Sequence, residues 1–227
     1  AHIDHSGVIP LFVKQGFLGA IFCTGATLDL CSAMLRDSAH IQEKDVIELR
    51  RKVKTKLNLE MSVAPEIVRI ALKVRPDEVC LVPEKRRELT TEGGLDVAGH
   101  ERKIKSVVER LKERGILVSL FIDPIGKQVR AARRVGADCV ELHTGRYAEA
   151  GTRKKRKQEL EKIKEAARLA RSLKLKLNAG HGLNYDNVRP VARISGLSDL
   201  NIGHSIVSRS VFTGLEQAVR EMKRLIK

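Results

Sequence analysis

The chain has 227 residues, a length that suits one domain with a sizeable core, so we expect a single domain spanning residues 1–227. Its composition is 42% hydrophobic and 31% charged, and the sequence has neither an apolar run of the roughly 18 residues that a membrane span needs nor an apolar leader, so we expect a cytoplasmic protein with no membrane partner. A formal net charge of +15 favours anionic partners, but only 3% of residues are aromatic and none is tryptophan, so we expect small phosphorylated substrates and no nucleic acid.

Short apolar runs alternate with longer amphipathic segments from residue 43 onward, which is the pattern of repeated βα units and a parallel sheet. Strands are predicted at 56–61, 78–82, 117–122, 138–143, 174–178 and 200–203, and two more at 3–4 and about 28–35 complete a set of eight. Helices are predicted at 43–54, 64–74, 97–114, 126–135, 156–172, 186–193 and 214–226, with Gly115 and Gly136 as helix-ending glycines. Eight strands with intervening helices in a chain of this length predict an α/β fold of the parallel (β/α)8 TIM-barrel type.

The densest basic run is Arg-Lys-Lys-Arg-Lys at residues 153–157. We interpret it as the solvated start of a helix rather than as a nucleic-acid patch. It is an unusual helix start, because cations oppose the positive end of the helix dipole.

The four cysteines, Cys23, Cys31, Cys80 and Cys139, are far apart, and three of them lie in apolar runs. They are predicted to be buried thiols rather than a disulfide framework. Neither a His-x-x-x-His spacing nor a Cys/His cluster occurs, so no metal site is expected.

Polar side chains follow most of the predicted strands at their carboxyl ends. In a parallel barrel these ends share one face, where loops assemble the active site. The residues concerned are Asp4 and His5 after the first strand, Arg36 after the second, Glu60 in the third, Glu141 and His143 in the sixth, Asn178 and His181 at the seventh, and Gly203 and His204 at the eighth. Acidic, basic and anion-binding groups are therefore expected to converge there.

Glu60 is the most informative single residue of this set. It lies in the run Asn58-Leu-Glu-Met61, a strand whose other residues look buried. Burial at a barrel mouth can raise the pKa of a carboxyl group toward neutrality and make it a general base. The alternative is a structural glutamate paired with a nearby Arg or Lys.

His181 lies in the run Ala179-Gly-His-Gly-Leu183, where flanking glycines allow a tight turn and close approach of a ligand. Gly203 and His204 precede a short segment, 206–212, that is predicted to be a helix with free N–H groups at its start. Loops after the last two strands, together with such a helix start, commonly bind phosphate in this fold.

Seven ordered motifs resemble the pyridoxine 5'-phosphate synthase family, over about residues 40–227. They are Asn58-Leu-Glu-Met61, Val82-Pro-Glu-Lys-Arg86, Thr90-Thr-Glu-Gly-Gly-Leu-Asp-Val97, Val118-Ser-Leu-Phe-Ile-Asp123, Glu141-Leu-His-Thr-Gly145, Asn178-Ala-Gly-His-Gly-Leu183 and Leu200-Asn-Ile-Gly-His204. The seven motifs together, in this order, indicate the family much more specifically than any one of them does.

The resemblance implies an octameric TIM-barrel transferase with additional helices and no metal or organic cofactor. Its reaction in vitamin B6 biosynthesis would condense 3-amino-2-oxopropyl phosphate with 1-deoxy-D-xylulose 5-phosphate to give pyridoxine 5'-phosphate, phosphate and water. The implied roles are general base for Glu60, proton donor for His181, xylulose-phosphate contacts for Asp4, His5, Arg36, His40 and Thr90, further substrate contact for Glu141, and amino-ketone phosphate binding for Gly182, Gly203 and His204.

Residues 1–39 depart from the family pattern. His2 stands where the family has asparagine, residues 6–35 contain no arginine, and Met34 stands where the family has a catalytic histidine. The spacing between Arg36 and His40 is also one residue short. A divergent homologue, a local shift in reading frame and a displaced alignment of the second strand each explain these departures, and the first implies a catalytically impaired homologue that still binds phosphorylated metabolites.

Overall fold

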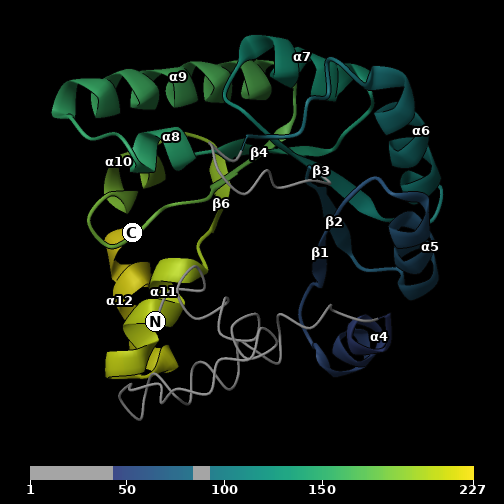
Figure 1. Ribbon diagram of the computed structural model, residues 1–227, viewed down its shortest axis with the longest axis horizontal. Helices are drawn as coiled ribbons and strands as arrows, with labels where there is room; N and C mark the ends of the chain where they lie inside the picture. The colour runs from purple at the N-terminus through teal and green to yellow at the C-terminus, as the bar shows by residue number, and fades with distance from the viewer. Residues whose placement is uncertain (1–42, 84–92) are drawn as a thin grey trace, which may run out of the picture.

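The computed structural model describes residues 43–83 and 93–227. Within these residues, six strands form one sheet in the order β1-β2-β3-β4-β5-β6, with every neighbouring pair parallel. The strands are β1 (Asn58–Met61), β2 (Glu78–Leu81), β3 (Leu117–Ile122), β4 (Cys139–His143), β5 (Lys176–Gly180) and β6 (Leu197–Asn201). The sheet curls as in a parallel β/α barrel (Figure 1).

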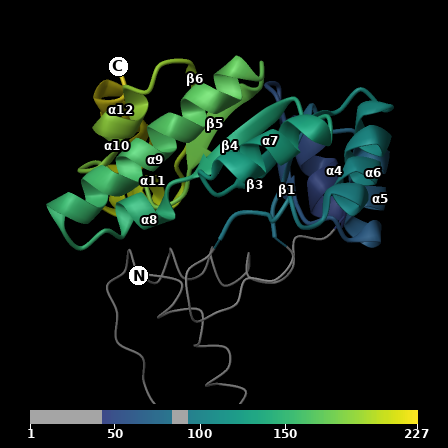
Figure 2. The same ribbon diagram turned by 90° about the horizontal axis from the view of Figure 1, so that it is seen from above.

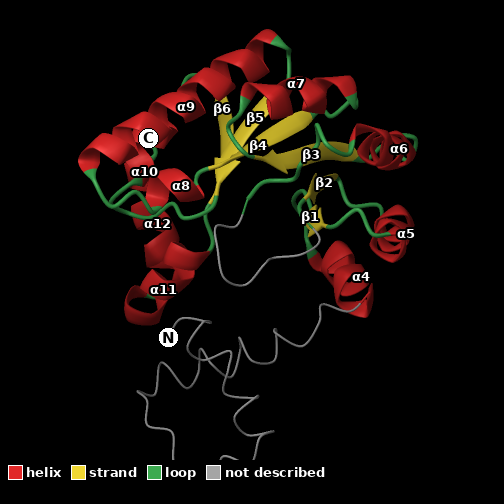
Figure 3. Ribbon diagram, turned by 45° about the horizontal axis from the view of Figure 1, so that its top comes forward, coloured by secondary structure: helices red, strands yellow, loops and turns green. Residues whose placement is uncertain are grey.

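Helices connect the strands and cover the outer face of the sheet. They are α4 (Glu43–Lys52), α5 (Pro65–Val74), α6 (Glu101–Lys112), α7 (Gly126–Arg134), α8 (Gly145–Ala148), α9 (Arg153–Ser172), α10 (Val188–Ala192), α11 (His204–Thr213) and α12 (Leu215–Leu225). Figure 3 shows α5, α6, α7 and α9 in an arc outside the strands, and Figure 2 shows the same layers from above. The concave face of the sheet is thus left for the interior of the barrel.

The core lies between this arc of helices and the strands. In α6 the buried residues Ile104, Val107, Val108 and Leu111 follow the spacing of one helical face. In β3 the side chains of Val118, Leu120 and Ile122 are fully buried. Burial of each such side chain contributes about 1.5–3 kcal/mol. The packing of the helices on the sheet is therefore stabilised by the apolar face that each element presents to the other.

The fold class predicted from the sequence is confirmed, and the strand at 117–122 has the predicted bounds. The fifth observed strand begins two residues later than predicted, because Lys174 adopts a left-handed conformation (φ 58°) after α9. The last strand begins three residues earlier than predicted, where Leu197 pairs with Leu177. The predicted strands at 3–4 and 28–35 lie outside the described residues.

The bounds of β1, β2 and β4 differ from the predicted ones by at most two residues, and further differences lie at the helix ends. Thr152 caps α9 by accepting a hydrogen bond from the Lys155 backbone N at 3.2 Å, so this helix starts at Arg153 rather than 156 and its basic run is exposed, as predicted. Gly115 (φ 73°) and Gly136 (φ 83°) are left-handed and follow helices α6 and α7, as predicted. Helix α8 was not predicted, since four residues are too few to show a period.

The two cysteines that the structure describes behave as predicted. Cys80 and Cys139 are buried and unpaired. Burial raises the pKa of both thiols, that of Cys139 to about 12, so neither is a thiolate at neutral pH. Cys23 and Cys31 lie outside the described residues. Among the described helices, none combines the length and apolarity that a membrane span requires.

Candidate active site

A buried carboxyl group, Glu141, lies at the centre of the inner face of the sheet. Its Oε2 accepts a hydrogen bond from Asn201 Nδ2 at 2.5 Å and lies 3.6 Å from the thiol Sγ of Cys80. Gly180 on β5 makes room for it, because a Cβ at this position would stand 2.3 Å from Glu141 Oε1. Three strands besides β4 therefore cooperate to hold one carboxyl group.

Glu141 is 3% exposed, and this burial is the main reason why its pKa is raised from 4.5 to about 7. The hydrogen bond from Asn201 opposes the shift, the charge of Glu60 adds to it, and the contacts with Cys80 and His143 oppose it. A carboxyl group with a pKa near 7 can both accept and release a proton at neutral pH. Glu141 therefore has the properties of a general acid–base group.

Glu60 was expected to be the partly buried carboxyl group, and this part of the prediction is wrong. In β1 both Asn58 and Glu60 are exposed, and only Met61 is buried. The alternative of a structural ion pair is not observed either, since no Arg or Lys among the described residues forms a salt bridge with Glu60. Glu60 is nevertheless close enough to Glu141 for its charge to raise the pKa of that group.

His143 follows Glu141 by two residues and is also buried. Its Nδ1 lies 3.1 Å from Oδ1 of Asp123, which directly follows β3. Asp123 Oδ1 also accepts a hydrogen bond from the Gly94 backbone N at 3.2 Å. The hydrogen bond from His143 is the largest of the effects that lower the pKa of Asp123, followed by that from Gly94 and by the charges of His143 and Arg146, against the opposing effect of burial.

His181 directly follows β5 and stands at the mouth of the barrel. It is exposed, and its backbone has φ 80°, a left-handed conformation that is uncommon outside glycine. Its ring packs at 4.9 Å from the His143 ring and 6.3 Å from the Phe121 ring. Strained backbone conformations of this kind cluster at functional sites, which agrees with the predicted role of His181.

The predicted phosphate-binding residues lie on two neighbouring loops. Gly182 has φ 74°, and a Cβ there would stand 2.7 Å from Ala148 Cβ, so the turn requires glycine. Gly203 and His204 are exposed at the start of α11, which has no side-chain cap, and a Cβ at Gly203 would meet nothing within 4 Å. Ser205 Oγ donates to Leu183 O at 2.9 Å and thereby joins the two loops.

The structure thus brings His181, Gly182, Gly203 and His204 to the carboxyl ends of β5 and β6, with Glu60 near the end of β1 and Glu141 in the middle of β4. The other predicted site residues, Asp4, His5, Arg36, His40 and Thr90, lie outside the described residues. Sequence reasoning assigned no role to Asp123, Asn201 or Thr144. Each directly follows a strand or ends one, so the position alone could have identified them.

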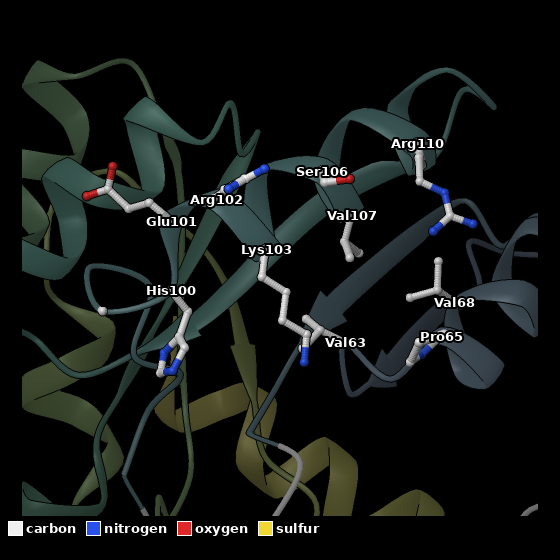
Figure 4. Close-up of a pocket in the computed structure, with 11 residues that line it drawn as sticks. Val63, Pro65, Val68, His100, Glu101, Arg102, Lys103, Ser106, Val107 and Arg110 are labelled. Carbon is white, nitrogen blue, oxygen red and sulfur yellow. The ribbon is translucent and has the colours of Figure 1, made fainter.

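A different hollow, a groove of about 600 Å³, lies between α5 and α6 in the outer helical layer (Figure 4). Val63, Val68 and Val107 line it with Lys103 and Arg110. Its lining contains none of the residues at the barrel mouth. Across residues 43–83 and 93–227, no three His, Cys, Asp or Glu side chains are grouped closely enough to hold a metal ion.

A parallel β/α barrel with an acid–base cluster and a glycine-rich pair of loops at its carboxyl-end face defines the class of barrel enzymes. The solved structure described as "Native KDPGal structure" shares this fold, with a TM-score of 0.56 and 13% identity over 83% of this chain and 80% of that one.

Sequence comparison identifies the family. Residues 20–227 match the family described as "Pyridoxal phosphate biosynthesis protein PdxJ", and the chain belongs to this family. It is 56% identical to the "Pyridoxine 5'-phosphate synthase" of Geobacter sulfurreducens over 84% of this chain and 80% of that protein. It is 57% identical to the protein of the same name from Synechococcus sp. over 83% of this chain and 79% of that protein.

Proposed function

We propose that the chain is a pyridoxine 5'-phosphate synthase, a single-domain barrel that condenses 3-amino-2-oxopropyl phosphate with 1-deoxy-D-xylulose 5-phosphate. The products are pyridoxine 5'-phosphate, phosphate and water. The observation that carries the proposal is the convergence of Glu60, Glu141 and His181 on one end of the barrel in a chain that is more than half identical to relatives of that name.

The reaction needs several proton transfers, because an amine attacks a ketone, water is lost, an enol forms and a ring closes. In this proposal Glu60 is the general base and His181 is the proton donor. Glu141 contacts the substrate between them, and its pKa of about 7 lets it take up or release a proton at neutral pH. The negative charge of Glu60 contributes to the raised pKa of Glu141.

The phosphate of the amino ketone binds at Gly182, Gly203 and His204. Three observations support this placement: the left-handed turn at Gly182, the open space in front of Gly203, and the start of α11, which has no side-chain cap. Backbone N–H groups at a helix start attract anions. The xylulose phosphate binds at Asp4, His5, Arg36, His40 and Thr90.

The enzyme is further proposed to be a cytoplasmic homo-octamer that works without a metal or organic cofactor. This part of the proposal rests on the resemblance to the synthase family. Light scattering on the purified chain measures the molar mass of the assembly and tests it directly.

The central experiment is to incubate purified protein with both substrates and to measure pyridoxine 5'-phosphate by its absorbance and by mass spectrometry. We expect turnover by the wild-type chain and loss of most of it, about 100-fold or more, in Glu60→Gln. Tight binding of both phosphates without product would contradict the proposal.

Met34 favours a second candidate function, a catalytically impaired homologue that binds phosphorylated metabolites. A methionine cannot take up a proton, and residues 6–35 contain no arginine to contact a phosphate. In this case Met34→His should raise a low wild-type turnover. An unchanged or lower turnover in Met34→His would remove the reason for this candidate.

A further inference from the structure

The pair formed by the half-buried Asp123 and the buried His143 has no role in the function proposed above, although it adjoins His181. The His143 side chain is 3% exposed and the Asp123 side chain is 21% exposed. The two residues come from neighbouring strands, at the end of β4 and directly after β3. This hydrogen-bonded pair lies beside the imidazole ring of His181 and can therefore influence the orientation of that ring.

The hydrogen bond fixes which nitrogen of His143 carries a proton. The pKa of Asp123 is lowered, first by His143 itself and then by the Gly94 N–H, so its side chain is a carboxylate at neutral pH and can only accept. Nδ1 of His143 must therefore carry the proton that it donates across 3.1 Å. This bond allows one orientation of the ring about its terminal torsion.

The orientation matters because the His143 ring forms one wall of the space that the His181 ring occupies. The two rings meet edge to face, with centroids 4.9 Å apart and planes at 63°. Phe121 also packs against His143, with centroids 5.0 Å apart and planes at 64°, and its ring lies 6.3 Å from that of His181. His143 is thus held between Phe121, the carboxylate of Asp123 and the ring of His181.

Gly145 shows how closely the two histidines are packed. A Cβ at this position would stand 2.6 Å from His143 Nε2 and 3.2 Å from His181 Cδ2, so any side chain there would displace both rings. Within the described residues, His143 Nε2 is buried and has no hydrogen-bond partner.

The backbone of His181 is held separately, by Thr144. Thr144 Oγ1 lies 2.5 Å from His181 O and 2.7 Å from Gly180 O. These contacts hold the left-handed backbone of His181, whose φ is 80°. The side chain of His181 is contacted by the ring of His143, which can therefore limit the rotation of the imidazole.

We propose that Asp123 and His143 are positioning residues for His181: Asp123 orients the His143 ring, and that ring holds the His181 imidazole at the barrel mouth. The inference rests on the proposed function for the role of His181 as proton donor. A misplaced proton donor lowers the rate of the chemical step much more than it lowers substrate binding.

Two variants distinguish the contribution of the His143 ring from that of its hydrogen bond to Asp123. His143→Asn keeps a donor near the position of Nδ1 but removes the ring, and Asp123→Asn keeps the ring but weakens the hydrogen bond and removes the charge. We expect kcat to fall about 10- to 100-fold in His143→Asn and about 10-fold in Asp123→Asn, while KM changes by less than about threefold. A fall in folded fraction with an unchanged kcat per folded molecule would overturn the proposal, since it would assign the pair a structural role only.

A double-mutant cycle with His181→Gln tests whether the pair acts through His181. Once the proton donor is gone, His143→Asn should change kcat by less than about twofold. Full additivity of the two losses would show that His143 acts independently of His181 and would overturn the proposal.

Crystal structures of the wild-type and variant proteins give a readout that does not need turnover. The rotamer of His181 should change in His143→Asn and in Asp123→Asn while φ at residue 181 stays positive. An unchanged His181 rotamer in both variants would overturn the positioning role. Absence of product from the wild-type chain, together with a displaced His181 in the variants, would instead reject the proposed function and leave the positioning role standing.

Discussion

Two glutamates face the interior of the barrel, and their surroundings differ sharply. Glu60 on β1 is exposed, whereas Glu141 on β4 is 3% exposed and is surrounded by residues of three other strands, β2, β5 and β6. The residue type is the same, but the burial of Glu141 raises the pKa of its carboxyl group to about 7. The comparison teaches that the position of a glutamate within the sheet, and not its residue type, decides how far its carboxyl group is removed from water.

Replacing Glu141 is expected to have the largest effect on activity. Glu141→Gln keeps the shape of the side chain and an oxygen for Asn201 Nδ2, but it can no longer exchange a proton. We expect kcat to fall by about 10²–10⁴-fold, the range for removal of a general acid–base group. Steady-state kinetics measure this loss, and equal kcat values for Glu141→Gln and wild type would remove Glu141 from the acid–base chemistry.

The same variant should reveal the cost of burying Glu141 as a function of pH. Between its ordinary pKa of 4.5 and its folded pKa of about 7, the folded state binds one more proton than the unfolded state. The free energy of unfolding therefore falls as the pH rises through this window and is level above it, with a total of about 3 kcal/mol.

Urea unfolding at pH 4 to 8 measures this dependence as the difference between wild type and Glu141→Gln. Relative to the wild type, the variant should gain stability as the pH rises from 4.5 to 7. A constant difference in the free energy of unfolding would show that Glu141 titrates at the same pH in the folded and unfolded states, and would contradict the raised pKa of Glu141.

A methyl group at Gly145 should disturb the histidine side of the site without changing either glutamate. Gly145→Ala places a Cβ 2.6 Å from His143 Nε2, so we expect kcat to fall about 10-fold as the rings of His143 and His181 shift. Gly151→Ala is the matched control, because a Cβ there meets nothing within 4 Å. Equal kcat values for the two variants would show that the close packing of the rings has no catalytic consequence.

The smallest effect is expected far from both glutamates. Thr152→Ala removes the hydrogen bond that caps α9 and should lower the free energy of unfolding by about 1 kcal/mol with an unchanged kcat. Thermal unfolding measures the loss of stability, and steady-state kinetics on the same sample measure kcat. A fall in kcat of Thr152→Ala would mean that a loss of stability by itself lowers activity. The kcat values of the Glu141 and Gly145 variants would then have to be corrected for their folded fraction.

Much of the fold could be predicted from the sequence, because apolar residues have a different spacing in the helices than in the strands. Strand β3 and the helix ends at Gly115 and Gly136 came out as predicted, since continuous apolar runs and left-handed glycines are local signals. Helix α8 and the start of α9 did not, because one is shorter than a period and the other depends on the cap at Thr152.

For the candidate site, the sequence by itself determined which residues stand at the carboxyl ends of the strands: Glu60, Glu141, His143 and His181 all follow from local strand patterns and parallel order. Only the tertiary structure decided how buried each of them is. It placed Asn201, Cys80 and Gly180 around Glu141, and Asp123 beside His143, over separations of 20 to 61 residues. Desolvation depends on neighbours that are distant in the sequence, so the burial that was predicted for Glu60 is found at Glu141.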